Sequence, residues 1–138
     1  MSSEEEFLDL LEDYDEEECL IAGAKYEFGR EGLPQDYKKA VRLYTRACSL
    51  GSAAAFSRLG FMYESGKGVD IDYERAFSLY ERACELGNRF GYLNLGYLYE
   101  GGLGVTKDLE AAKVCFKKAC DLGIMTGCDE FARLEDAL

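Results

Sequence analysis

Six cysteines are the residues whose chemistry stands out first, because thiolates bind metals and pair into disulfides. Zinc sites need four converging ligands, commonly Cys and His, yet this sequence contains no His and no Cys-x-x-Cys pair. Three of the cysteines recur at a step of 36 residues, which follows a repeat and not a coordination sphere. We therefore predict no metal site and no cofactor. The six positions are Cys19, Cys48, Cys84, Cys115, Cys120 and Cys128.

Catalytic pairs of nucleophile and base are the next chemistry to consider. Without His, the sequence offers no Ser–His or Cys–His pair. No Ser is followed three residues later by Lys, and Lys-Thr-Gly is absent, so the serine β-lactamase motifs are missing. The glycine-rich segment Gly101–Gly104 lacks the preceding strand of a phosphate-binding loop. These residues predict a protein that is not an enzyme.

The elements that carry these residues are set by an internal repeat. The heptad at 45–51, which reads TRACSLG, returns at 81–87 and at 117–123 with Ala, Cys, Leu and Gly in register. A fixed period of this length is typical of stacked helix pairs. The sequence therefore predicts an all-α solenoid of about three helix-pair repeats with a capping helix at each end.

Helix boundaries follow from the same register. Each second helix begins near an Asp, which can cap free backbone amides, and ends at a Gly, which accepts a left-handed turn. We expect first helices near residues 16–28, 52–64, 88–100 and 126–137, and second helices near 36–50, 72–86 and 108–122. Gly60 and Gly96 lie inside first helices, where the missing side chain lets two helices approach closely. The first loop carries one extra residue between Tyr26 and Gly32.

The negative charge is concentrated at the N-terminus. Ten of the 27 acids lie within residues 1–18 with no Lys or Arg, which leaves 17 acids against the 16 bases elsewhere. Residues 3–6 resemble a capping box, and an apolar stripe follows it. Residues 1–18 are therefore expected to be an acidic capping helix, with a disordered tail as the alternative. The stripe consists of Phe7, Leu10, Leu11 and Tyr14.

Charge and hydropathy also bear on partners and compartment. A nucleic-acid or anionic-membrane surface would need clustered Lys and Arg, so neither partner is expected. No stretch approaches the roughly 20 apolar residues of a membrane span. The sequence opens on acidic residues where a secretion signal would be basic and then apolar. We expect a cytoplasmic monomer, with a secreted or periplasmic protein lacking its signal as the alternative.

Several linked motifs resemble the Sel-1-like repeat, a relative of the tetratricopeptide repeat. They are Leu-Gly-x-x-Tyr at 59–63 and 95–99, Gly-Val at 68–69 and 104–105, Asp-x-x-x-Ala at 36–40, 72–76 and 108–112, and the closing heptads. On this resemblance, residues 19–138 are expected to form the Sel-1-like repeat solenoid. It implies a right-handed superhelix whose first helices line a concave face, and an adaptor or scaffold role.

A cysteine-rich bacterial subset of that family, called β-lactamase-like, carries a disulfide between two positions eight residues apart in each repeat. Only Cys120 and Cys128 match both positions here. The resemblance implies a bridge between them, and two free thiols are the alternative in a reducing compartment. The other four cysteines are interpreted as small buried apolar residues.

The concave face is the candidate binding surface. If Leu59 and Leu95 pack inward, helical geometry turns a set of aromatic, Arg and Asn side chains toward the groove. Aromatic rings supply contact area, and Asn can bond an extended backbone. The alternative is that the aromatic residues only complete contacts between neighbouring helices. The candidate residues are Ser57, Arg58, Phe61, Phe90, Leu93, Asn94, Tyr97 and Arg133.

The sequence therefore predicts a non-enzymatic interaction module that binds a peptide or protein segment on its concave face. The alternative, which the subset resemblance alone implies, is a β-lactamase-like or penicillin-binding protein.

Overall fold

A computed structural model describes residues 2–137. Residue 1 of the expected N-terminal segment 1–18 and residue 138 of the expected solenoid 19–138 lie outside the described range. Within that range the chain forms eight α-helices and no strand. Their bounds are α1 (Ser3–Asp13), α2 (Glu16–Phe28), α3 (Tyr37–Ser49), α4 (Ala53–Ser65), α5 (Tyr73–Glu85), α6 (Arg89–Gly101), α7 (Leu109–Asp121) and α8 (Met125–Ala137).

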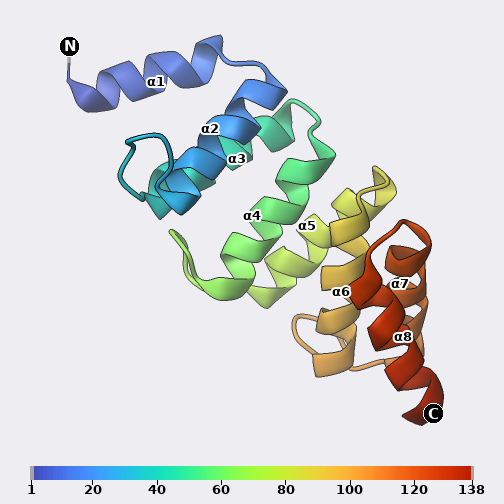
Figure 1. Cartoon of the computed structure of the whole chain (residues 1–138). Coiled ribbons are helices and arrows are strands. Elements are labelled where there is room, and N and C mark those ends of the chain that lie inside the picture. The colour runs from blue at the N-terminus through green and yellow to red at the C-terminus, as the bar shows by residue number, and fades with distance from the viewer. Residues whose placement is uncertain (1, 138) are drawn as a thin grey trace.

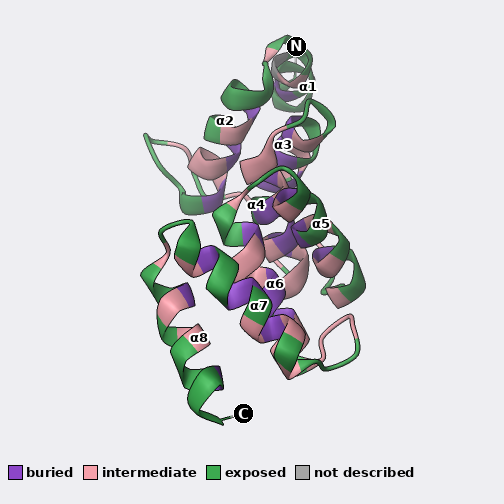
Figure 2. Cartoon of the chain, turned by 90° about the vertical axis from the view of Figure 1, so that its right-hand side faces the viewer, coloured by how far each residue is buried: buried purple, intermediate pink, exposed green. Residues whose placement is uncertain are grey.

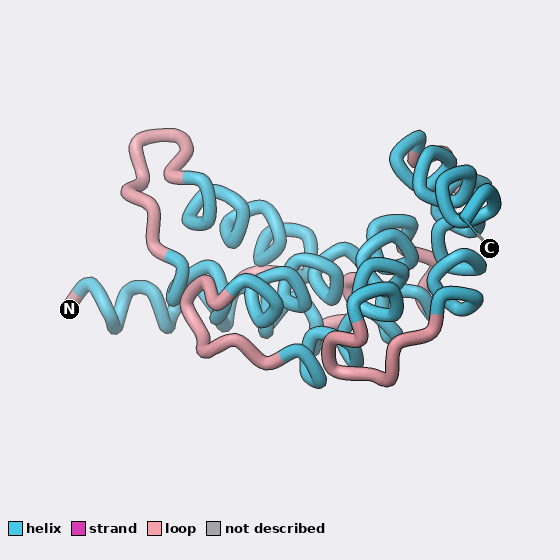
Figure 3. The backbone as a smooth tube through the Cα atoms, turned by 90° about the horizontal axis from the view of Figure 1, so that it is seen from below, coloured by secondary structure: helices cyan, strands magenta, loops and turns pink. Residues whose placement is uncertain are grey.

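The helices after α1 form antiparallel pairs that follow one another in a row (Figure 1). α2 packs on α3, α4 on α5 and α6 on α7, while α8 packs on α7 at the C-terminal end. Short loops join the helices at their ends, as Figure 3 shows. The all-α solenoid expected from the sequence is thus confirmed. None of the described helices is long and apolar enough to cross a membrane.

Helix starts and ends repeat because their capping residues repeat. The side chains of Asp36, Asp72 and Asp108 accept hydrogen bonds from backbone amides three residues later, at 3.1, 3.0 and 3.0 Å. At the other end of each second helix, Gly51, Gly87 and Gly123 have positive φ angles of 97°, 82° and 99°. This conformation strains L-residues with a Cβ but not glycine, so glycine ends the helix as the sequence predicted.

Each first helix meets its second helix at a glycine that faces an aromatic ring. A Cβ added at Gly60 would lie 2.6 Å from Cε1 of Tyr80, and one at Gly96 would lie 2.7 Å from Cε1 of Phe116. Gly23 stands in the same relation to Tyr44. The ring thus occupies the space of the missing side chain, which confirms the predicted close approach.

The core lies between the two helix layers, and Figure 2 shows the buried segments on the inward sides of the helices. Its largest fully buried side chains include the three rings that face the glycines. Alanines at equivalent positions of the second helices, among them Ala40, Ala76 and Ala112, are fully buried. Small residues at these positions let the layers approach, so the core repeats along the row.

The acidic N-terminal segment forms α1, and Phe7 is its most buried side chain; Leu11 also packs on the core, and Glu4 pairs with Arg42 of α3. Phe7 is 3% exposed and packs edge-on against Tyr26 with 6.0 Å between ring centres. The side chain of Leu10 lies outside the described atoms. The predicted cap is wrong by one residue: Ser2, and not Ser3, accepts a hydrogen bond from the Glu5 amide. The reason is that the helix already includes Ser3.

Candidate functional site

One cavity of about 490 Å³ opens between the first helices and is here called the groove. α2, α4 and α6 contribute most of its lining, and α3 contributes the ring of Tyr44. Five of the eight predicted surface residues line it. The full lining is Leu20, Ile21, Ala24, Tyr44, Ala54, Ser57, Arg58, Phe61, Asn88, Phe90 and Asn94.

The groove lies where the first helices stand apart. α4 and α6 pack directly on each other, whereas α2 and α4 are joined mainly through α3. The walls are mostly apolar, and two of the apolar side chains, Ile21 and Phe90, are 48% exposed. An open apolar cavity with a few polar groups is the general form of a ligand site.

Equivalent positions of successive repeats line the groove. Ile21, Arg58 and Asn94 occupy one register position on α2, α4 and α6, and Glu130 is the same position on α8. The first step is 37 residues and the next two are 36, because the loop after α2 is one residue longer. Sequence analysis missed the contribution of α2, although this offset register could have identified Ile21 as the counterpart of Arg58.

Ser57 lies in the wall of the groove, and its hydroxyl is already hydrogen-bonded within the protein. It is only 6% exposed, and its hydroxyl donates a 2.6 Å hydrogen bond to Oδ1 of Asn88. That same oxygen accepts from the Gly91 amide at 3.0 Å, which caps α6. Ser57 therefore ties α4 to the start of α6 and leaves little hydrogen-bonding capacity for a ligand.

Arg58 and Asn94 are the polar groups that remain available. Within residues 2–137 the Arg58 guanidinium has no ion-pair partner, and the Asn94 amide makes no hydrogen bond. The guanidinium carbon lies 5.4 Å from the ring centre of Phe28, a cation–π distance. This contact holds the long side chain at the groove without neutralising its charge.

A buried acid, Glu27, lies next to Tyr44, one of the residues that line the groove. The Tyr44 hydroxyl donates a 2.6 Å hydrogen bond to Oε1 of Glu27, a residue that is 1% exposed. Burial raises the pKa of Tyr44 well above its ordinary value, and the bond to the Glu27 carboxylate raises it further, while Arg58 and Arg30 act in the opposite direction. The second carboxylate oxygen of Glu27 has no hydrogen-bond partner among the described residues.

Three predicted surface residues lie outside this cavity. Leu93 packs against the core cluster of α7 and α8. The Tyr97 ring stacks edge-on against Phe116 with 5.0 Å between centres, and burial raises its pKa. Arg133 bonds Glu100 at 2.6 Å and Glu130 at 2.7 Å. The structure thus brings together five predicted residues and leaves these three in contacts between helices.

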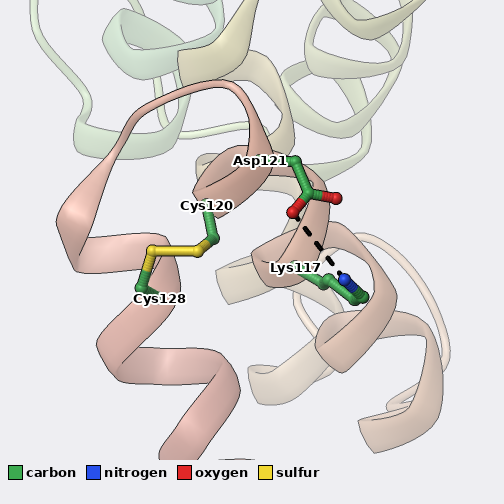
Figure 4. Close-up of a disulfide and its surroundings, with 4 residues drawn as sticks. All are labelled: Lys117, Cys120, Asp121 and Cys128. Carbon is green, nitrogen blue, oxygen red and sulfur yellow. Dashed lines mark ion pairs between the residues drawn. A yellow bond between two sulfur atoms is a disulfide. The ribbon is translucent and has the colours of Figure 1, made fainter.

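The cysteines separate into one bridge and four thiols. A disulfide joins Cys120 at the end of α7 to Cys128 in α8, with 4.6 Å between their Cα atoms (Figure 4). Cys19 and Cys115 are buried as predicted, but Cys48 and Cys84 are only partly buried because each lies near the end of its helix.

The four thiols have little thiolate character. Burial raises the pKa of both Cys48 and Cys84 to about 12 and that of Cys115 to about 11, and it also raises the pKa of Cys19. A thiol that stays protonated is a poor nucleophile and a poor metal ligand. Within residues 2–137 no three His, Cys, Asp or Glu side chains are grouped to hold a metal ion.

The repeat register, the paired helices and the glycine–ring contacts agree with comparison against known families. The sequence model of the Sel1 repeat matches residues 19–52, 53–88 and 90–124. The chain belongs to the Sel1 repeat family. Sel1 repeats generally act as protein–protein interaction modules, and their scaffold is typically non-enzymatic. Comparison with curated proteins gives no match.

Solved structures with Sel1 repeats resemble the chain in both sequence and fold. A protective antigen present in uropathogenic Escherichia coli strains is 33% identical with a TM-score of 0.82; the match covers 86% of this chain but only 25% of the antigen. A Sel1 repeat protein from Oxalobacter formigenes is 30% identical with a TM-score of 0.77; the match covers 96% of this chain and 99% of that protein. Cysteine-rich protein B of Helicobacter pylori is 29% identical with a TM-score of 0.66; the match covers 85% of this chain and 97% of that protein.

Proposed function

We propose that this Sel1 repeat chain is a non-enzymatic adaptor that binds a peptide or protein segment in the groove. One observation carries the proposal: Arg58 and Asn94, which form no ion pair or side-chain hydrogen bond within residues 2–137, lie in a cavity with the half-buried ring of Phe61 and the exposed side chains of Phe90 and Ile21. Rings and aliphatic side chains provide area for burial, and the two polar groups fix the orientation of a chain.

Nothing in the groove favours the β-lactamase-like alternative. Its one serine is Ser57, whose hydroxyl donates to the Asn88 side chain. An acyl-transfer nucleophile needs a neighbouring base that accepts its proton, and neither Lys nor Glu is among the lining residues. The cavity is therefore better suited to recognition than to hydrolysis.

Compartment is part of the same proposal. The Cys120–Cys128 bridge and the cysteine-rich Helicobacter relative support the secreted or periplasmic alternative over the expected cytoplasm. Disulfides persist mainly in oxidising compartments. Blocking free thiols in intact cells before lysis, then reducing and labelling, tests this: two newly labelled cysteines support an oxidising compartment, and none supports the cytoplasm. The expected monomer stays a prediction.

A random peptide library tests the groove itself. Peptides enriched on the wild type are measured by fluorescence polarisation against a Phe61→Ala, Asn94→Ala double variant and against Val114→Ala. Val114 is 66% exposed on α7, outside the groove, so its variant is a matched surface control. We expect the double variant to lose at least about tenfold in affinity, since an aromatic anchor and an amide are both removed. Equal binding by all three proteins would reject the groove as the site.

A further inference from the structure

Charge is distributed unevenly along the row of first helices. At the α8 end Arg133 is neutralised by Glu100 and Glu130, with which it forms ion pairs at 2.6 and 2.7 Å. At the groove, Arg58 has no carboxylate within ion-pair distance in residues 2–137. Arg58 is therefore the one charged side chain among the residues that line the groove, and it forms no ion pair within residues 2–137. An occupant that supplies a carboxylate would be complementary to it.

The position of Arg58 indicates which part of an occupant it meets. Ile21 on α2, Arg58 on α4 and Asn94 on α6 are successive counterparts, so Arg58 lies on the middle of three helices. Neighbouring packed helices are about 8–10 Å apart, and α2 and α4 do not pack directly on each other, so a segment that crosses all three helices spans at least about 20 Å, or about six extended residues. The middle of such a segment, and not its terminus, lies at Arg58.

Apolar surface lies on both sides of that cation. Toward α2 the lining is Leu20, Ile21 and Ala24, and α6 contributes Phe90; Phe61 lies on α4 itself, one turn after Arg58. These surfaces suit bulky apolar side chains of the occupant, and burial of such side chains supplies most of the binding free energy.

We propose that the groove selects a partner segment with an internal acidic residue between bulky apolar residues. The acidic side chain pairs with Arg58, the apolar neighbours contact the α2 and α6 sides, and the Asn94 amide bonds the backbone. This inference rests on the proposed peptide-binding function. It adds the charge of the occupant and the place of that charge within the segment.

Three pools of blocked heptapeptides test the inference. All are acetylated and amidated, which removes terminal charges; the fourth residue is fixed as Glu, Gln or Lys and the others are randomised among apolar residues and Gly. Binding of each pool is measured on the wild type, on Arg58→Glu and on Lys38→Glu. Lys38 is exposed in the first turn of α3, outside the groove, and its reversal changes the net charge equally.

We expect the wild type and Lys38→Glu to prefer the Glu pool over the Lys pool by about tenfold, with the Gln pool between them. Arg58→Glu is expected to reverse that order. Binding that depends on Phe61 and Asn94 but is equal for the three pools would overturn the acidic preference and leave the groove proposal standing. Binding that the Phe61→Ala, Asn94→Ala variant retains in every pool would instead reject the groove, and the inference with it.

Discussion

The Tyr44 hydroxyl donates a 2.6 Å hydrogen bond to the Glu27 carboxylate across the first helix pair, and the second pair repeats it: Tyr80 donates to Glu64 at 2.8 Å. In the third pair Phe116 replaces the tyrosine, and the counterpart acid Glu100 accepts instead from Arg133 of α8. An acid at this position is thus paired in every repeat, and the change of partner connects the last repeat to the terminal helix.

Removal of the Tyr44 hydroxyl should destabilise the fold more than the equivalent change at Tyr80. Tyr44→Phe leaves both oxygens of Glu27 without partners in a site that is 1% exposed, and a buried polar group without a partner costs about 1–3 kcal/mol. Glu64 is only partly buried, so water can replace the lost bond in Tyr80→Phe. Urea unfolding of both variants measures the difference, and equal losses would contradict it.

The contact between Gly60 and Tyr80 predicts an unusual effect of alanine. In an exposed helix Gly→Ala stabilises by about 1 kcal/mol, but here the new Cβ would lie 2.6 Å from a fully buried ring. We expect Gly60→Ala to destabilise by about 1–3 kcal/mol because the ring must move in a packed core. Gly101→Ala is the control, since its Cβ would meet only the Leu103 side chain, at 3.3 Å. A stabilised Gly60→Ala protein would show that the two helices separate easily.

The architecture was readable from the sequence because one period sets caps, glycines and core together. The Asp caps and the paired glycines are local signals, repeated three times, so each copy supports the others. The groove was only partly readable, since the alignment of α2 with α4 depends on one inserted loop residue. Leu93 and Arg133 are predicted for the binding surface, because sequence position does not reveal that Leu93 packs on the core cluster of α7 and α8 or that Glu100 binds Arg133.

High pH should weaken the folded state through its thiols. Burial raises the pKa of Cys48 and Cys84 from 9.0 to about 12, so above about pH 9 the unfolded chain loses thiol protons that the folded chain retains. Stability is then fully present below about pH 9 and falls as pH approaches about 12. The urea midpoint is therefore expected to drop between pH 8 and about pH 10.5. The drop should be smaller in a Cys48→Ala, Cys84→Ala protein; an identical drop would assign the effect to other groups.

The disulfide should stabilise the C-terminal end of the solenoid. Closing the short loop between Cys120 and Cys128 lowers the conformational entropy of the unfolded chain. In this chain-entropy model the bridge raises the free energy of unfolding by about 2–3 kcal/mol. Denatured, unreduced protein should show the four free thiols Cys19, Cys48, Cys84 and Cys115, and reduced protein six. A Cys120→Ser, Cys128→Ser variant is expected to unfold at lower urea than the wild type, with Cys84→Ser as control. Six free thiols before reduction would contradict the bridge.

Helix α1 should detach without unfolding the solenoid. Among the described side chains of α1, only Phe7 is less than 9% exposed. The Lys39 ammonium and the Arg42 guanidinium lie over its ring, 5.4 and 4.9 Å from the ring centre. Phe7→Ala removes the most buried contact of α1, and only the half-buried Leu11 and the surface Glu4–Arg42 ion pair remain to hold an acidic 11-residue helix that is too short to be stable alone in water. We expect far-UV circular dichroism to lose roughly the signal of α1 while the midpoint of the main thermal transition changes by a few degrees at most. Leu8→Ala, at a position 43% exposed, should leave both unchanged. A collapse of the main transition in Phe7→Ala would show instead that α1 is integral to the first repeat.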